Sequence, residues 1–303
     1  MNRLAALAVV GAAAACVAPH EQTAAPASAP APVMVARPVV VPPAVAAPVG
    51  PTTFLYQGEL TQGGWIRGQI PAGTISARLG EQPLAFDAEG RFFAAFDRDA
   101  GPQTSLAATL ADGRRIDGPL VVSLRAWDIE HINGSPTADV PSAEFTARRR
   151  PELERIAAAR RQETGSQGWR QVFVWPVTGR ISGRFGSQRV YRGEPGSYHS
   201  GIDIAAGATG TPYVAPADGV VVLAAEAPFT LEGNLLIIDH GMGLSSAFLH
   251  SSVLLVREGE TVRQGQTIGR IGMTGRATGP HLHWGLFWRG ARLDPLLFTG
   301  PMP

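Results

Sequence analysis

The chain has 303 residues, a formal net charge of +1 and 45% hydrophobic residues. This length predicts about two domains, and the near-zero charge provides no overall field that would recruit nucleic acid. There is no lysine, which excludes Schiff-base and lysine-nucleophile chemistry. The single cysteine, Cys16, excludes internal disulfides and cysteine-based zinc sites.

Residues 1–16 are typical of an export signal. The apolar stretch Leu4 to Val10 precedes the small residues Ala12 to Ala15, as before a cleavage site. Cys16 then follows as in a bacterial lipobox, although Ala13 stands where such motifs usually have leucine. An ordinary secretory cleavage, with the cysteine incidental, is the alternative. Both interpretations predict an exported, periplasmic protein, and lipidation of Cys16 would anchor it to the membrane.

Residues 17–52 are rich in Pro, Ala and Val and carry almost no charge. Because proline cannot donate a backbone hydrogen bond in helix or sheet, this segment is predicted to be an extended, semi-rigid linker. At about 3 Å per residue it would separate an anchor from the folded part by up to ~100 Å.

From residue 53 to residue 141, short alternating apolar runs are separated by turn residues. This pattern predicts a small antiparallel β-sandwich, immunoglobulin-like in type. Its aromatic residues would suit a sugar-stacking platform, but a hydrophobic core is the simpler interpretation. His131 is expected on the surface, in a turn beside Asn133-Gly134. The apolar runs are Trp65–Ile70, Leu84–Phe86, Arg91–Phe96, Leu106–Leu110 and Leu120–Leu124, and the aromatic residues are Trp65, Phe86, Phe92, Phe96 and Trp127.

The apolar period changes in residues 142–171, which are predicted to link the two domains. An apolar stripe among charges predicts a helix from about Pro151 to Gln162. Its many arginines would allow contact with an anionic polymer or lipid headgroups. A solvated helix whose arginines pair with Glu152 and Glu154 is the alternative. The stripe consists of Leu153, Ile156 and Ala157.

Residues 172–303 are predicted to form the second domain, with strands of an antiparallel sheet broken by glycine at turns. A sheet of this kind would carry its functional side chains on one face of a rigid groove. The predicted strands are Val220–Leu223, Asn234–Asp239, Ser245–Leu249, Thr267–Ile271 and His283–Phe287.

Five of the seven histidines lie between residues 199 and 283, in a stretch otherwise poor in titratable groups. Imidazole binds zinc well, and a catalytic zinc site takes three protein ligands from His, Asp or Glu and leaves a fourth position for water. In extended backbone, His199 and Asp203 project from one face, and so do His281 and His283. Both histidines of the second pair could bind one metal, or one could bind while the other carries protons.

A series of short motifs surrounds these histidines in one continuous order. The motifs include His199-Ser200-Gly201-Ile202-Asp203, Gly210-Thr211-Pro212, Asp218-Gly219-Val220, Ile238-Asp239-His240-Gly241, Gly259-Glu260-Thr261-Val262, Gly265-Gln266-Thr267-Ile268-Gly269 and Gly279-Pro280-His281-Leu282-His283. This order resembles that of the lysostaphin/LytM-type peptidoglycan zinc metallopeptidases. The resemblance implies a compact, mainly antiparallel β-domain with zinc at the floor of a groove.

Carried over residue by residue, the resemblance implies one zinc ion per chain, bound by His199, Asp203 and His283. It implies catalytic roles without metal binding for His250 and His281. His240 matches a recurrent position that is not a ligand, so it is interpreted as structural. Two neutral imidazoles and one carboxylate leave the zinc site at net +1, enough to lower the pKa of a bound water toward ~7. We expect His281 to take the proton of the attacking water and His250 to assist the oxyanion and leaving amine, with exchangeable roles.

The resemblance favours a zinc endopeptidase that cuts peptide cross-links of peptidoglycan, between D-Ala and diaminopimelate if the host is Gram-negative. The alternative is a noncatalytic or latent LytM-type module that binds the wall or activates an amidase. The peptide stems of peptidoglycan are the expected partner, and the sequence does not indicate an oligomeric state. Tyr191 or Tyr198 would be able to supply a hydroxyl to the transition state. Where the family commonly has an acidic residue, this chain has Gly285, a departure that bears on substrate fit.

Overall fold

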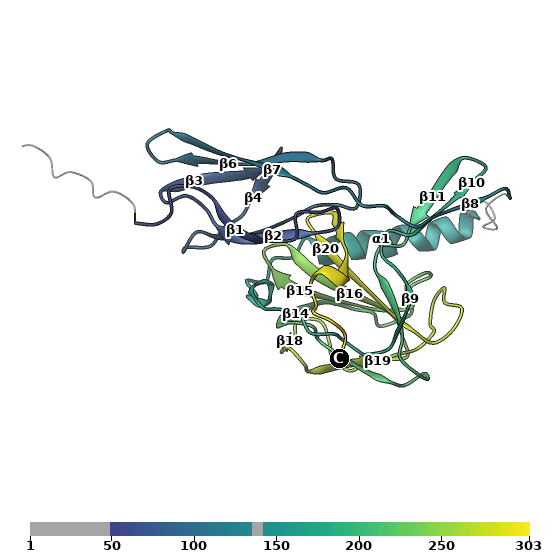
Figure 1. The fold of residues 1–303 in the computed structure, drawn as a ribbon. Coiled ribbons are helices and arrows are strands. Elements are labelled where there is room, and N and C mark those ends of the chain that lie inside the picture. Colours follow the sequence, from purple (N-terminus) through teal and green to yellow (C-terminus); the bar gives the residue numbers. More distant parts are fainter. Residues whose placement is uncertain (1–48, 135–141) are drawn as a thin grey trace, which may run out of the picture. The chain divides into compact units, whose positions relative to one another are not determined.

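The computed structural model describes residues 49–134 and 142–303. The predicted export signal, Cys16 and nearly all of the predicted linker at 17–52 lie outside these residues. The described residues belong to one compact unit, Ala47–Pro303. Its architecture is mainly antiparallel β with a single α-helix, as the sequence predicts (Figure 1). No helix in the described ranges is long and apolar enough to cross a bilayer.

Two antiparallel sheets form the N-terminal part. The first has the strand order β1-β2-β5 and the second β4-β3-β6-β7. The predicted strand at 120–124 is displaced, because β7 ends at Val121. The turn at Asp112-Gly113 closes the β6–β7 hairpin, so β7 pairs with β6 directly after that turn rather than over the later apolar residues. The strands are β1 Leu55–Gly58, β2 Trp65–Gln69, β3 Thr74–Leu79, β4 Gln82–Leu84, β5 Arg91–Ala95, β6 Gln103–Leu110 and β7 Arg115–Val121.

The aromatic residues of this part pack as core. Phe92 and Phe96 are buried. Trp65 stacks on Phe93, and its indole N–H donates to the Leu297 carbonyl over 2.9 Å. These contacts belong to a hydrophobic cluster that continues into the C-terminal strands. The core interpretation therefore describes these rings better than a sugar-stacking platform, because their faces are covered by protein.

His131 is exposed, as expected, but it lies in a strand and not in a turn. Strand β8, Ile129–Ile132, pairs in parallel with β10, Gln188–Tyr191, which forms a hairpin with β11, Glu194–Tyr198. The bend at Asn133-Gly134 follows this strand. The reason is tertiary: the distant hairpin supplies hydrogen bonds that keep the backbone around His131 extended.

The helix α1 spans Ala143–Arg160 and so begins before the predicted start at Pro151, which lies inside it. Ser142 caps the helix by accepting a hydrogen bond from the Phe145 N–H. The buried side chains are Ile156 and Ala159, whereas Leu153 of the predicted stripe is exposed. The helix packs by this face on the central strands of the C-terminal sheet, with Val222, Leu235, Ile237, Ala247 and Phe287. Packing on a sheet offsets the hydrogen bond that proline removes from the helix.

An eight-stranded sheet of order β18-β14-β15-β16-β20-β12-β9, with β21 beside β20, forms the C-terminal part. All of the strands predicted here are present. A smaller sheet has the order β13-β19-β17. The strands are β9 Arg180–Gly183, β12 Ile202–Ala205, β13 Pro212–Val214, β14 Gly219–Ala224, β15 Asn234–Gly241, β16 Leu244–Ser251, β17 Val253–Leu254, β18 Thr261–Val262, β19 Thr267–Arg270, β20 Leu282–Trp288 and β21 Ala291–Leu293, and the 3₁₀ helices are η1 Gly168–Arg170 and η2 Pro295–Leu297.

Candidate metal centre and groove

Strand register brings two of the predicted ligands together. In the antiparallel pair of β12 and β20, Asp203 lies directly opposite His283. The flanking side chains Ile202, Ile204 and Trp284 are fully buried in the core. Because side chains alternate along a strand, Asp203 and His283 project from the other face of the sheet. His199 reaches the same point from the segment just before β12.

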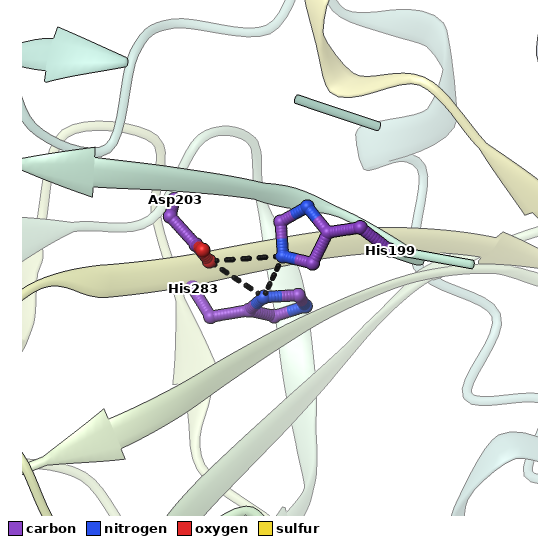
Figure 2. Close-up of side chains that lie close together, drawn as sticks. All are labelled: His199, Asp203 and His283. Atoms are coloured by element: carbon purple, nitrogen blue, oxygen red, sulfur yellow. Dashed lines mark hydrogen bonds and ion pairs between the residues drawn. The ribbon is translucent and has the colours of Figure 1, made fainter. Parts of the chain in front are cut away.

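The side-chain atoms of these three residues converge (Figure 2). The Nδ1 of His283 lies 2.9 Å from the Oδ1 of Asp203 and 3.1 Å from the Nε2 of His199, and that Nε2 lies 3.1 Å from the same Oδ1. Zinc bonds of about 2.0–2.2 Å separate two ligands of a tetrahedral site by roughly 3.3–3.5 Å. The three donor atoms lie slightly closer together than this, and their chemistry suits a small divalent cation.

Backbone contacts orient the rings. The Nδ1–H of His199 donates to the Arg184 carbonyl over 3.0 Å, which leaves the Nε2 lone pair directed at Asp203 and His283. Gly183 stands beside the carboxylate, where an added Cβ would clash with Asp203 Oδ2. Gly201 similarly leaves room for His283. Gly183 and the Arg184 carbonyl could not be recognised from the sequence, since neither carries a side-chain signal.

The charges of the cluster are strongly coupled. Burial alone would raise the pKa of Asp203, but hydrogen bonds and attraction from His199 and His283 outweigh it and hold that pKa far below its ordinary value. Burial would lower the pKa of His199, yet the same carboxylate raises it. The more deeply buried His283 has a lowered pKa, mainly through loss of hydration. The carboxylate is therefore ionised, and His283 is neutral, at physiological pH.

His250 and His281 stand beside this cluster, with ring centroids 4.9 Å apart. The Nδ1–H of His250 donates to the Thr274 carbonyl and that of His281 to the Gly279 carbonyl, each over 2.8 Å. Because a carbonyl can only accept, each ring keeps Nε2 as the nitrogen that can take a proton. The Nε2 of His281 lies 3.6 Å from Asp203 Oδ1.

His250 has three further features. Burial lowers its pKa to about 4, so the ring is neutral near pH 7. Its backbone has φ of 65°, an uncommon value for a residue other than glycine. Its backbone N–H donates to the Glu232 carbonyl over 2.9 Å, so the loop that precedes β15 holds the backbone of His250 in place. A left-handed backbone conformation beside the cluster of His199, Asp203 and His283 is typical of a functional position.

Two adjoining cavities form a groove over the cluster, and His199 and Asp203 line both. The larger, of about 890 Å³, is bounded by Asp128 and Glu130 near β8 and by the β10–β11 hairpin. The smaller, of about 360 Å³, contains all five predicted site residues: His199, Asp203, His250, His281 and His283. The structure therefore brings every predicted site residue to one groove, with the candidate metal ligands where the two cavities meet.

Residues 197–295 match the model of peptidase family M23. This stretch is a peptidase family M23 domain. Peptidoglycan DD-endopeptidase ShyA of Vibrio cholerae is 40% identical over 127 residues, or 41% of this chain and 28% of that protein. Murein hydrolase activator NlpD of Escherichia coli K12 is 34% identical over 166 residues, or 55% of this chain and 40% of that protein. The matches thus span less than half the length of either relative.

The fold likeness extends beyond the M23 domain. A crystal structure of a proposed M23 peptidase from Pseudomonas aeruginosa has a TM-score of 0.61 and 27% identity, and the alignment covers 80% of this chain and 96% of that one. This coverage is too large for residues 197–295 alone. The N-terminal sheets of the present chain therefore accompany an M23 domain in a fold that another protein shares.

None of the remaining sequence candidates belongs to the converging trio, although Tyr198 lines both cavities. His240 is fully buried, with Nδ1 bonded to the Asp218 carbonyl and Nε2 to the Ser246 hydroxyl, which agrees with its structural interpretation. Tyr191 lines only the larger cavity. The ring of Tyr198 lies 4.8 Å and 5.1 Å from the guanidinium carbons of Arg98 and Arg292. In the M23 domain Tyr198 therefore joins the groove wall to the N-terminal part.

Proposed function

We propose that the protein is a zinc-dependent endopeptidase that hydrolyses peptide cross-links of peptidoglycan. The convergence of His199, Asp203 and His283 on one point, with His250 and His281 beside it, is the observation that carries this proposal. An M23 domain and a relative named as a peptidoglycan DD-endopeptidase support the reaction class.

His199, Asp203 and His283 would hold one zinc ion per chain. A bound zinc ion would lower the pKa of a coordinated water toward about 7 and polarise the carbonyl of the scissile bond. The donor set fits: two imidazole nitrogens and an ionised carboxylate oxygen face one another with spacings of 2.9–3.1 Å. The His199 Nε2 and His283 Nδ1, 3.1 Å apart, are neighbouring donor atoms that one cation between them would bind together.

His281 and His250 would move protons. His281 accepts the proton of the attacking water at Nε2, because its Nδ1 is held by the Gly279 carbonyl. His250 assists the oxygen of the scissile carbonyl and the leaving amine through its own Nε2. Both rings are anchored in the same way, so the two roles are exchangeable in principle. Variants at each position separate the roles, as the Discussion sets out.

The proposed substrate is a peptide joining two glycan strands, cut between D-Ala and diaminopimelate. The relative named as a peptidoglycan DD-endopeptidase supports cleavage within peptidoglycan peptides, and this bond is the one expected if the host is Gram-negative. An open groove with cavities of about 890 and 360 Å³ on two sides of the metal cluster suits a chain that extends past the cut on both sides. The expected export signal would place the enzyme in the periplasm, where such peptides occur.

Activation of another murein hydrolase is the second candidate. It is favoured by the relatives named as activators, one of which matches more of this chain than the endopeptidase does. A protein with that role has no need of three metal ligands and two proton carriers in one groove. The presence of the whole set here favours hydrolysis as the primary function.

The test combines zinc content with release of muropeptides from purified peptidoglycan, for the protein and its His283→Ala variant. Stoichiometric zinc and new peptide ends, both lost in the variant, would establish the endopeptidase and name the bond. Zinc without cleavage, together with faster hydrolysis by an added amidase, would favour the activator. A protein that binds no zinc and cleaves nothing would refute the proposed enzyme.

A further inference from the structure

The groove contains one arginine that forms no ion pair with a carboxylate. Arg276 lines both cavities, together with His199 and Asp203. Of the other charged side chains in the groove, Arg189 pairs with Glu130 over 2.8 Å and Glu232 with Arg149 over 2.6 Å. Within residues 49–134 and 142–303, no Asp or Glu lies within ion-pair distance of Arg276. Its guanidinium is thus available to a ligand at the point where the two cavities meet.

The backbone under Arg276 is fixed. Its N–H donates to the Leu231 carbonyl over 2.9 Å. Gly275 has φ of +72° and lies so close to the backbone of Gly233 that no other residue fits. Thr274 accepts a hydrogen bond from the Asn234 N–H over 2.9 Å, and its carbonyl holds His250. The segment that accepts the hydrogen bond of His250 therefore also carries Arg276. The backbone of the arginine thus has a fixed position beside the proposed reacting groups.

The chemistry of this position selects an anion. A guanidinium offers a planar fork of donors that matches a carboxylate, and such charge-assisted bonds are about twice as strong as neutral ones. Because Arg276 borders the cavity that holds His250 and His281, a carboxylate bound to it would belong to a residue next to the scissile bond. A lysine at this place would supply only a point charge.

We propose that Arg276 determines specificity by binding a free carboxylate on the substrate residue adjacent to the bond that is cut. The preferred substrates are then peptides in which this carboxylate is not amidated. The inference rests on the proposed endopeptidase function and adds to it the side group that the groove recognises. Arg276 acts in binding the substrate and takes no part in proton transfer.

The test uses two synthetic cross-linked peptides that differ only in a carboxylate or a carboxamide on the residue adjacent to the scissile bond. For the zinc-loaded full chain, we expect kcat/KM to be about 10- to 100-fold higher for the carboxylate. Arg276→Gln should remove this preference, mainly through KM, and Arg276→Lys should keep part of it. Arg257→Gln is the matched control, because that arginine is exposed and lines neither cavity, and its ratio should stay within about two-fold of the wild-type ratio.

Equal cleavage of the two peptides by the wild type, or an unchanged preference in Arg276→Gln, would overturn the inference. Binding of the same peptides, followed by fluorescence anisotropy, separates this result from a failure of the proposed function. If the protein cleaves neither peptide, the endopeptidase proposal fails. Tighter binding of the carboxylate peptide that disappears in Arg276→Gln would still support the assignment of Arg276, whereas equal binding would refute it.

Discussion

The M23 domain contains histidines in two contrasting surroundings on one sheet. His240 on β15 is enclosed, with Nδ1 held at 2.8 Å by the Asp218 carbonyl, Nε2 at 2.7 Å by the Ser246 hydroxyl, and its ring against Phe173. His199 and His283 instead direct ring nitrogens at one another and at Asp203 across the floor of a groove (Figure 2). In His240, both ring nitrogens therefore have hydrogen-bond partners within the protein. The nitrogens of His199 and His283 that face each other and Asp203 are placed to bind a proton or a metal cation, and this difference distinguishes the two kinds of histidine.

The largest expected effect tests the cluster of His199, Asp203 and His283. His283→Ala removes one of the three proposed metal ligands, so we expect zinc content to fall from about one per chain toward zero, with activity at background. Elemental analysis and muropeptide release measure both. His131→Ala, at an exposed histidine on β8, is the control and should keep zinc and activity. Stoichiometric zinc in His283→Ala would contradict the assignment of the ligands.

The second prediction separates proton carriers from ligands. His281→Gln and His250→Gln should keep zinc, since neither residue belongs to the converging trio. Each should lower kcat by about 10²- to 10⁴-fold, the usual contribution of general acid–base catalysis. The pH profile of kcat/KM should lose its acidic limb in one variant and its basic limb in the other. Wild-type turnover in either variant would dismiss that residue's catalytic role.

The third prediction concerns the enclosed histidine. Burial lowers the pKa of His240 to about 4, while the unfolded value is about 6.5. As pH falls from 6.5 to 4, the unfolded chain gains a proton that the folded chain refuses, so stability is complete above pH 6.5 and declines through this window. The loss is about 1.4 kcal/mol per pH unit, or roughly 3 kcal/mol in all.

Urea unfolding of the wild type and His240→Gln at pH 7 and pH 5 measures this effect. The wild type should lose about 2 kcal/mol more than the variant between the two pH values. His131→Gln, at an exposed position, should behave like the wild type. If His240→Gln shows the same pH dependence as the wild type, then His240 is not held neutral by its surroundings.

The smallest expected effect tests whether α1 supports the loop that holds His250. His240 is held by the core, but His250 depends on a loop that α1 holds from outside: Arg149 pairs with both carboxylate oxygens of Glu232, whose carbonyl accepts from the His250 N–H. Arg149→Met should lower stability by about 1–2 kcal/mol, because it leaves Glu232 partly buried and unpaired. Activity should fall several-fold.

Arg150→Met is the matched control for the Arg149–Glu232 ion pair, since Arg150 lies on the exposed face of α1, 3.8 Å from Glu154. Its melting temperature and activity should remain near those of the wild type. If Arg149→Met is as active and as stable as Arg150→Met, the helix does not support the groove.

Much of the M23 domain followed from residues whose chemistry is visible in the sequence. Strands such as Asn234–Gly241 and Leu282–Trp288 consist of apolar runs between glycine turns, and their existence was predicted. The start of α1 was not. Proline at position 151 signals a helix start locally, but packing of Ile156 and Ala159 on the sheet and the cap at Ser142 extend the helix on its N-terminal side.

The sequence by itself determined which side chains gather in the groove, because ligand and proton-carrier chemistry belongs to residue types and to their collinear order. Tertiary structure decided how those side chains are held and oriented. The Asp203–His283 register, the carbonyls of Arg184 and Thr274 and the free guanidinium of Arg276 depend on segments distant in the chain. A backbone carbonyl is the same in every residue, so only the fold can give it a partner.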